Sequence, residues 1–288
     1  MFGAIEAGGT KFVCAVSDED LNIIERVTIP TTTPEETFKK TFELFDRYNL
    51  KAIGIGSFGP IDVNTSSATY GFITSTPKIL WQNTDFRSVF QKRYNIPIGW
   101  DTDVNAAALG EVSLGAAKDK NSCVYVTVGT GIGGGAVLNG ETVTGFNHPE
   151  MGHFYPPRHE KDTYAGICDF HGSCLEGLAA GPAIEARYGL RAEELPKDHE
   201  AWEIEAHYLA HAALVYTTVL SPSCIIFGGG VMNQEQLFPK IREQFSKLLK
   251  NYLNLPPFEE YIIPTGLGND SGILGSLLLA QKALHEER

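Results

Sequence analysis

The sequence is poor in cysteine, has no long apolar run and lacks an excess of positive charge, and each shortage excludes a class of protein. Five cysteines in 288 residues are too few for a disulfide scaffold, so we expect thiols or metal ligands in a reducing compartment. Because no 18-residue apolar run is present, no segment is expected to span a membrane. The first residues also lack a basic region followed by an apolar stretch, so we expect no signal peptide and a cytoplasmic protein.

The balance of charge argues against nucleic acid as a partner. A formal net charge of -12 would make the surface repel a polyanion. Apolar residues make up 43% of the chain and charged residues 20%, which is typical of a globular protein. The length suffices for two domains of roughly 150 residues each, and no low-complexity linker is present.

Strands and helices alternate along the chain, which favours an α/β fold. The spacing of Phe38, Phe42 and Phe45 predicts an amphipathic helix, and Thr33 before Pro34 suits its N-cap. Residues 61–81 are polar and turn-rich and are expected to form a long loop. The other predicted helices cover residues 85–94, 104–115, 175–188, 202–220, 234–252 and 271–285, and strands are predicted at 51–58, 96–99, 224–227 and 261–264.

The stretch from Val124 to Gly140 contains an apolar run, a glycine-rich turn and a second apolar run. Five of the seven residues from Gly129 to Gly135 are glycine, which is more than a hairpin turn needs. Glycine lets a ligand approach the main chain, and successive N–H groups can converge on an anion, so the turn predicts a phosphate site. The glycine spacing also fits the dinucleotide fingerprint, but that fingerprint requires a following helix, and residues 136–138 read as a strand.

A similar pattern opens the chain, where residues 2–16 contain an apolar run, the turn Gly8-Gly9 and another apolar run. This pattern predicts a β-hairpin. Two halves that each begin with a glycine-turn hairpin suggest an internal duplication, although glycine turns between strands are common enough for a chance match. Lys11 is able to supply charge to a phosphate, but a lysine at the edge of a strand is more often an ordinary surface residue.

Asp103 follows a predicted strand and precedes a predicted helix. Its carboxylate is therefore expected at the end of a sheet, where ligands of open α/β sheets gather. An aspartate at this place is suited to accept a proton from a substrate hydroxyl. A plain N-cap aspartate is the commoner reason for this pattern, so the residues alone leave both interpretations open.

A segment without clear periodicity carries a predicted zinc site. Cys168, His171 and Cys174 fall within seven residues, and His153 lies fifteen residues upstream. Two thiolates and two imidazoles form a tetrahedral zinc set, and four protein ligands leave no open position, so we predict a structural site. The segment cannot bury much apolar surface, and a bound metal would order it.

Two carboxylates, Glu150 and Glu176, flank the predicted zinc ligands. Beside a rigid loop they are suited to hold sugar hydroxyls, although two solvated acids would look the same in the sequence. A zinc hydrolase is a competing interpretation of the same cluster. It would need an open metal position and an activated water.

In combination, the motifs resemble the ROK sugar kinases (repressors, open reading frames and kinases), which have the two-lobed actin-like, ribonuclease H-like ATPase fold with duplicated β-hairpin-containing domains. The resemblance runs almost end to end. It is to the fructokinase branch, because most ROK kinases carry a three-cysteine run where this chain has CDFHGSCLEG. The other motifs are GAIEAGGTK, DTDVNAAALGE, VGTGIGGG, HPEMGH, FGGGV and GNDSGILG.

The resemblance implies two lobes with the sugar between them. Residues 1–115 plus about 272–288 would form the small lobe, and residues 116–271 the large lobe carrying the zinc loop. Closure of the lobes would exclude water and suppress wasteful ATP hydrolysis. Family members are often dimers, so we expect a homodimer whose partners are a small-molecule sugar and ATP, without nucleic acid or membrane.

The resemblance also implies an ATP site. No sequence feature holds magnesium firmly, so we expect the ATP phosphates and waters to carry most of the Mg²⁺. The implied ATP-binding residues are Gly8, Gly9, Thr10 and Lys11 in the first phosphate motif, Gly129, Thr130 and Gly131 in the second, and Pro222, Gly228, Gly229, Gly230, Asp270, Ser271, Gly272, Ile273 and Leu274 around the adenosine.

On the sugar side, the resemblance makes Asp103 the general base that accepts the proton of the attacking hydroxyl. It places Glu150, His153 and Glu176 at the sugar, with His153 also binding zinc. Asn105, just after the base, would help to shape the site.

Two departures from the family pattern fall near the sugar. Many hexose-binding members have Asn-Asp at the base, where this chain has Thr102-Asp103, and many have Pro-Asn where it has Pro77-Lys78. Both changes put glucose in doubt and suit a ketose.

The implied activity is ATP- and Mg²⁺-dependent phosphorylation of fructose at the 6-hydroxyl, with Zn²⁺ in a structural role. Mannose or glucose remains an alternative sugar. A sugar-responsive regulator is less favoured, because the family's repressors carry an N-terminal helix-turn-helix domain, whereas the kinase hairpin here begins at Phe2.

Overall fold

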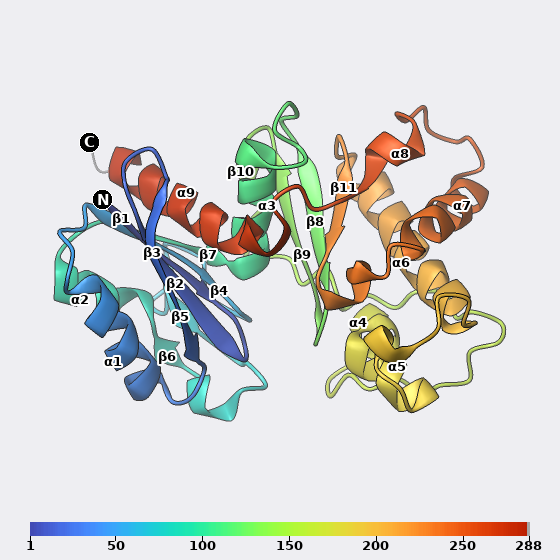
Figure 1. The fold of residues 1–288 in the computed structure, drawn as a ribbon, viewed down its shortest axis with the longest axis horizontal. Helices are drawn as coiled ribbons and strands as arrows, with labels where there is room; N and C mark the ends of the chain where they lie inside the picture. The colour runs from blue at the N-terminus through green and yellow to red at the C-terminus, as the bar shows by residue number, and fades with distance from the viewer. Residues whose placement is uncertain (287–288) are drawn as a thin grey trace.

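The computed structural model describes residues 1–286; residues 287–288, the end of the predicted small lobe, lie outside the described part. Two five-stranded sheets, one from each half of the chain, form the two sides of the molecule (Figure 1). Among residues 1–286, no helix is both long and apolar enough to cross a lipid bilayer. The architecture is mixed α/β, as the alternation of elements predicts.

The first sheet has the order β3-β2-β1-β4-β7. The predicted N-terminal hairpin is present, because β1 pairs antiparallel with β2 around the turn at Gly8-Gly9. β1 also pairs parallel with β4, and β4 with β7, which places the carboxyl ends of β1, β4 and β7 at one edge. The bounds are β1 (Phe2–Ala7), β2 (Lys11–Ser17), β3 (Ile23–Pro30), β4 (Ala52–Ser57) and β7 (Ile98–Thr102).

The second sheet repeats this topology strand for strand. Its order is β10-β9-β8-β11-β12, with β8 antiparallel to β9 and parallel to β11. The glycine-rich turn is therefore the turn of a hairpin followed by a strand, which excludes the dinucleotide-binding interpretation. The bounds are β8 (Cys123–Val128), β9 (Ile132–Leu138), β10 (Glu141–Thr142), β11 (Ile225–Gly228) and β12 (Ile262–Pro264). The repeated topology supports the predicted duplication.

Helices cover both faces of each sheet. Phe38 of α1 (Pro34–Phe45) and Phe90 of α2 (Arg87–Tyr94) share one buried aromatic cluster with Phe12 of the first sheet. The predicted cap of α1 is present, since the Thr33 hydroxyl accepts the N–H of Glu36. One face of the second sheet packs against helices of the C-terminal half. These are α4 (Leu175–Ala179), α5 (Gly181–Tyr188), α6 (Ala201–Leu220), α7 (Leu237–Leu249) and α8 (Phe258–Tyr261), with short 3₁₀ turns η2 (Ala192–Glu194), η3 (Gly230–Asn233) and η4 (Gly268–Asp270).

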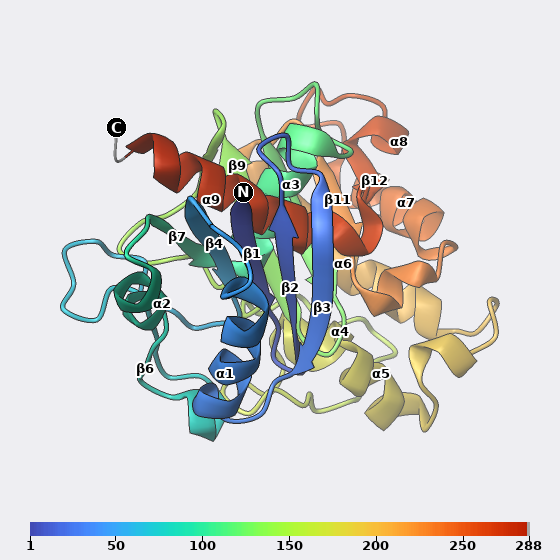
Figure 2. The same ribbon diagram turned by 60° about the vertical axis from the view of Figure 1, so that its left-hand side comes forward.

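Two helices cross from one half of the molecule to the other. α3 (Asp103–Leu114) follows the first sheet but packs on the second, through Ala108 and Val112. α9 (Ser271–Glu286) follows the second sheet but packs on the first, through Ile273 and Leu277. The two helices lie side by side between the sheets (Figures 1 and 2). Their backbones approach so closely that a Cβ at Gly275 would lie 1.7 Å from the Ala106 carbonyl oxygen, which only glycine permits.

The structure differs from the sequence-based expectation in its smaller elements. Strand β3 is not predicted, because Glu25 interrupts its apolar alternation; the carboxylate is instead satisfied by the Tyr48 hydroxyl and Arg47. The expected loop at 61–81 contains β5 (Phe72–Ile73), which pairs with β6 (Thr84–Asp85), and the 3₁₀ turn η1 (Ile79–Trp81).

Of the predicted helices, one is divided into two and another is shorter than expected. The helix expected at 175–188 is broken at Ala180, whose extended backbone separates α4 from α5. Pro182 lies in the first turn of the second helix, which begins at Gly181; it has no N–H with which to continue the first helix. The helix expected at 234–252 is α7, which begins at Leu237 and ends at Leu249.

Candidate active site

Asp103 lies at the junction of β7 and α3, at the carboxyl edge of the first sheet. The cap of α3 is Thr102, whose hydroxyl accepts the N–H of Asn105 at 3.0 Å, so Asp103 is the first residue of the helix rather than its cap. Its Oδ1 accepts the N–H of Val104 at 2.9 Å. Burial raises the pKa of Asp103 to about 6. The carboxyl group is therefore tuned toward the neutral range, as a general base requires.

Glu6, the next acid in this region, was not assigned a role from the sequence. It is the half-buried, second-to-last residue of β1, and buried Ala7 separates it from the glycine turn. Burial, and then the charge of Asp103, raises its pKa to about 7, while Arg26 and Lys11 oppose the shift. Within residues 1–286 the buried Oε2 has no hydrogen-bond partner. An acidic residue in an otherwise apolar strand was the available signal.

The first glycine turn is fixed by hydrogen bonds to neighbouring residues, and its tip is exposed to solvent. The Gly8 N–H donates to the Lys11 carbonyl at 2.9 Å, and the Thr31 hydroxyl donates to the Gly8 carbonyl at 2.8 Å. Thr10 and Lys11 are exposed. The turn is therefore fixed by its neighbours, and its outer side is available to a ligand.

The second glycine turn is fixed in the same manner. The Gly129 N–H donates to the Gly131 carbonyl at 2.9 Å, and the Gly129 carbonyl accepts the N–H of Gly181, at the start of α5, at 2.8 Å. Glu176 supports the turn from the other side, because its Oε2 accepts the N–H of Ile132 at 2.9 Å. Thr130 is exposed at the tip.

A pair of carboxylates flanks His153 on the side of Asp103. Glu150 Oε2 lies 3.9 Å from His153 Nε2, and Glu176 Oε1 lies 4.0 Å from the same nitrogen. Burial, followed by the charges of Asp103 and Glu176, raises the pKa of Glu150 to about 7. The structure thus brings together Asp103, Glu150, His153 and Glu176, which come from separate parts of the sequence.

Two residues missed by the sequence analysis tie this site to the first half of the chain. His148 Nε2 accepts the N–H of Ile61 at 3.0 Å. The Asn147 amide donates to the Ile61 carbonyl at 2.9 Å and accepts the N–H of Val63 at 3.1 Å. His148 opens the HPEMGH motif two residues before Glu150, and Asn147 directly precedes that motif, but their sequence gives no signal of a partner more than 80 residues away.

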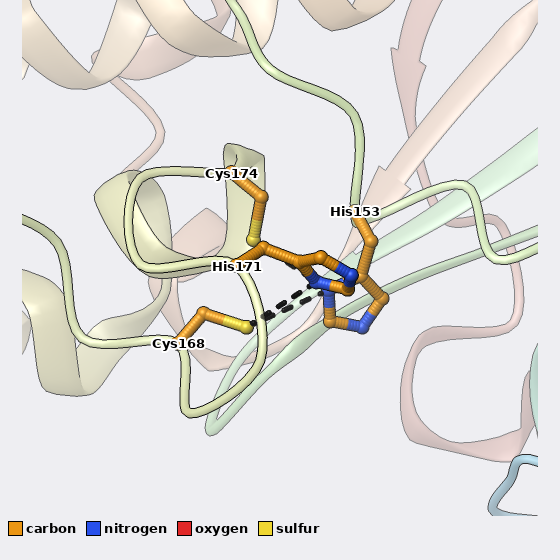
Figure 3. Close-up of side chains that lie close together, drawn as sticks. All are labelled: His153, Cys168, His171 and Cys174. Carbon is orange, nitrogen blue, oxygen red and sulfur yellow. Dashed lines mark hydrogen bonds between the residues drawn. The ribbon is translucent and has the colours of Figure 1, made fainter.

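The predicted zinc ligands meet at one point (Figure 3). Sγ of Cys168 lies 3.8 Å from His153 Nδ1 and 3.7 Å from His171 Nδ1, and Sγ of Cys174 lies 3.5 Å from His153 Nδ1. In a tetrahedral zinc site, neighbouring sulfur and nitrogen ligands are about 3.6 Å apart. These three distances are close to that value, and the four ligand atoms all lie within 4.8 Å of one another, so the four residues are suited to hold a Zn²⁺ ion.

The predicted adenosine residues Gly228, Gly229 and Gly230 line a cavity of about 570 Å³ beyond the carboxyl end of β11. Gly229 has φ +88°, and a Cβ there would lie 2.4 Å from the Val128 carbonyl oxygen, so this turn requires glycine. The other lining residues, beside those glycines, are Phe227, Met232, Asn233, Glu235, Phe238, Pro239, Arg242, Pro264, Thr265, Gly268 and Asn269.

Some of the residues implied for the adenosine site lie elsewhere. Pro222 is buried before β11, at the opposite end of the strand from the glycines, and it does not line this cavity. Ile273 is fully buried in the core against the first sheet, and Leu274 packs against that core; neither lines the cavity. Helix α9 directs these two side chains toward the core beneath the first sheet. The lining residues in this part of the chain are Gly268 and Asn269, directly before Asp270.

The first turn of α9 is held by residues of the first half. Ser271 donates its hydroxyl to Glu111 at 2.7 Å. Gly272 faces Glu6, since a Cβ on the glycine would lie 2.5 Å from the Glu6 carboxyl carbon. Asp270 forms an ion pair with Arg26.

Asn105 is a positioning residue in this geometry. Its Nδ2 donates to Asp101 Oδ1 at 2.8 Å, and its Oδ1 accepts the N–H of Ala136 on β9 at 3.1 Å. The side chain is buried and links the first turn of α3 to the second sheet. It therefore helps to hold Asp103 in place through the backbone and does not reach a ligand through its amide oxygen.

The comparisons with known proteins concern the chain as a whole. The family model described as the ROK family matches residues 2–283. A fructokinase of Streptococcus mutans is 49% identical, with 98% of each chain covered, and a fructokinase of Pediococcus pentosaceus is 48% identical, with 99% of each covered. Among solved structures, a ROK hexokinase from Thermus thermophilus aligns with a TM-score of 0.80 at 28% identity, over 99% of each chain.

Proposed function

The chain belongs to the ROK family, and on this basis we propose that it is a fructokinase that transfers the γ-phosphoryl group of ATP to the 6-hydroxyl of fructose. The observation that carries the proposal is the position of Asp103. Its half-buried carboxyl group lies at the carboxyl edge of the first sheet, close enough to Glu6 and Glu150 for its charge to raise the pKa of both. Relatives that match nearly the whole chain carry the name fructokinase.

Asp103 is the proposed general base. Its carboxylate takes the proton of the sugar hydroxyl while that oxygen forms a bond to the γ-phosphorus and the bond to the ADP oxygen breaks. Positioning and charge neutralisation supply most of the catalysis in phosphoryl transfer, and the base contributes about 10²–10⁴-fold. Because its pKa is near 6, Asp103 is mostly ionised at neutral pH and has a basicity suited to the transfer.

Glu150, Glu176 and His153 are the proposed sugar-binding residues. A carboxylate accepts hydrogen bonds from hydroxyl groups, and two carboxylates on either side of one imidazole can orient a polyol. The departure at Thr102, next to the proposed base, supports fructose over glucose. Mannose is the second candidate, because this departure does not argue against it.

The proposed nucleotide site follows the two glycine turns. Gly8 to Lys11 and Gly129 to Gly131 hold the phosphates, and the cavity beyond Gly228 to Gly230 receives the adenosine. Mg²⁺ neutralises phosphate charge when bound. Glu6 fits this role, since its orphaned buried oxygen is an acceptor suited to a magnesium-bound water.

Zn²⁺ has a structural role in this proposal. With four protein ligands it has no open position for a water, so a zinc hydrolase is disfavoured. His153 links the metal to the sugar, because its Nδ1 faces the thiolates and its Nε2 faces Glu150 and Glu176. We also propose that residues 1–115 with 272–288 close as a lobe against residues 116–271, and that the protein is a homodimer.

The test is the turnover of an Asp103→Asn variant. We expect kcat to fall by about 10²–10⁴-fold, with the fold and the zinc content retained. Asp119→Asn, an exposed aspartate, is the matched control and is expected to keep wild-type turnover. Near wild-type turnover of the Asp103 variant would show that another group is the base.

The sugar is tested separately with a panel of fructose, mannose, glucose and N-acetylmannosamine with ATP. Fructose is expected to give the highest kcat/KM. Preference for mannose or glucose would leave the kinase assignment intact and replace the substrate. The absence of ATP turnover with every sugar, together with sugar binding, would favour the regulator instead.

A further inference from the structure

Lys78 is held rigidly in the segment between β5 and β6. Its N–H donates to the Thr76 hydroxyl at 3.3 Å, and its carbonyl accepts the N–H of Trp81 at 2.8 Å. Trp81 is only 1% exposed and donates its indole N–H to the Thr32 carbonyl at 2.7 Å. The buried tryptophan therefore anchors the backbone from which the Lys78 side chain extends.

The Lys78 side chain lies across the first glycine turn. A Cβ at Gly9 would lie 2.8 Å from Lys78 Cε and 3.9 Å from Nζ. The missing side chain at Gly9 thus leaves the space that the lysine stem occupies. The departure at Pro77-Lys78 therefore lies against the first glycine turn, which is proposed to hold phosphate.

The ammonium group of Lys78 is not neutralised. Within residues 1–286 its Nζ forms no hydrogen bond and no ion pair, although the side chain is half-buried. The Lys11 ammonium, at the other end of the turn, is exposed and likewise forms no hydrogen bond or ion pair among the described residues. Two such ammonium groups beside one glycine turn form a site for a multiply charged anion.

We propose that Lys78 binds the terminal phosphoryl group of ATP during its transfer and is a catalytic residue of this enzyme; the inference rests on the proposed kinase function. A point charge at this position stabilises the charge that is shared among the phosphoryl oxygens as the bond to ADP breaks. The asparagine that many hexose-binding relatives carry at this place is shorter and neutral, and would not supply that charge.

The test compares Lys78→Met and Lys78→Arg with the wild type. Methionine keeps much of the stem and removes the charge, so we expect kcat to fall about 10²-fold. Arginine is expected to recover part of the loss. Affinity for AMPPNP is expected to fall, whereas affinity for ADP, which lacks the terminal group, stays unchanged. Lys118→Met, at an exposed lysine far from the turn in sequence, is the control expected to match the wild type.

A double-mutant cycle with Gly9→Ala adds a second measurement. The new Cβ would collide with Lys78 Cε and displace the side chain. If both changes act through the same ammonium group, the double variant loses less activity than the product of the two single losses. If the activity losses of the two single variants multiply in the double variant, the functional coupling between Gly9 and Lys78 is overturned.

Three outcomes overturn the proposal: wild-type kcat in Lys78→Met, equal weakening of ADP and AMPPNP, or a change confined to the KM of the sugar. The last would make Lys78 a sugar-binding residue. Nucleotide binding is measured without sugar, so this comparison decides the role of Lys78 even if the wild-type enzyme prefers another sugar or shows no turnover. Failure of the proposed function is seen instead in the sugar panel.

Discussion

His153 contacts Glu150 with one ring nitrogen and the metal ligands with the other. Its Nε2 lies 3.9 Å from Glu150 Oε2, while its Nδ1 lies 3.5 Å from Cys174 Sγ. A metal bound at Nδ1 fixes the ring orientation and leaves the Nε2 proton for a carboxylate. The metal site and the proposed sugar site are therefore joined through a single side chain.

This relationship predicts that loss of zinc weakens sugar binding. His171 is exposed and meets the cluster only from its outer side, so His171→Ala removes a metal ligand without touching Glu150. We expect the KM for fructose to rise about 10-fold or more, because support of a ligand shell typically contributes 10–100-fold. Zinc content and initial rates measure the effect.

Asp169→Ala, an exposed acid in the same loop, is the control and is expected to retain zinc and the wild-type KM. A His171→Ala protein that has lost its zinc and still binds fructose normally would separate the two sites. A wild-type protein that contains no zinc after expression in zinc-supplemented medium would contradict the metal assignment itself.

Glu111, on α3, is expected to stabilise the segment of residues 266–271, which precedes and begins α9. Its carboxylate is fully buried and accepts four hydrogen bonds, from the N–H groups of Ala116, Gly266 and Leu267 and the hydroxyl of Ser271. In Glu111→Gln one carboxylate oxygen becomes an NH₂ group. This group faces hydrogen-bond donors and cannot accept hydrogen bonds from them. We expect the free energy of unfolding to fall by about 2–4 kcal/mol, measured by urea denaturation.

The same change is expected to raise the KM for ATP more than that for the sugar, because Gly268 and Asn269 line the cavity that we propose for the adenosine. Glu43→Gln, at an exposed position of α1, is the matched control with an unchanged urea midpoint. An unchanged midpoint in Glu111→Gln as well would show that the four hydrogen bonds contribute little.

Glu205 predicts a pH-dependent stability. It is buried in α6, and within residues 1–286 neither carboxyl oxygen has a hydrogen-bond partner. Burial raises its pKa well above the ordinary value, with Arg187 opposing. The folded protein therefore keeps the proton while the unfolded chain loses it above about pH 4.3, so stability falls as pH rises from there toward the folded-state pKa.

Glu205→Gln removes this loss, because the amide is neutral at every pH. The variant is expected to have a higher urea midpoint than the wild type at pH 8 and to lose that advantage at pH 4. Glu185→Gln, exposed on α5, should follow the wild-type curve throughout. Parallel pH curves for Glu205→Gln and the wild type would mean that the buried carboxyl group is compensated in both forms.

The large elements of the fold follow from local sequence patterns. The glycine turns at Gly8-Gly9 and Gly129 to Gly135, the aromatic stripe of α1 and the alternation of strands and helices predict the two hairpins and the α/β class. The sequence does not predict strand β3, because Glu25 interrupts its apolar alternation. It also does not predict the division between α4 and α5, because the only local signal for that break is Pro182. The family model over residues 2–283 confirms the resemblance.

By itself, the sequence determined the chemical types in the site: two glycine turns, an aspartate before a helix, and a Cys/His set with zinc spacing, because these depend on residues close together in the chain. Only the tertiary structure decided which distant groups meet. Glu6 and Asp103 share one edge because β1 and β7 run parallel in the same sheet, and Lys78 reaches Gly9 because buried Trp81 anchors its segment. Such contacts arise from packing across more than 60 residues of chain, which no local pattern encodes.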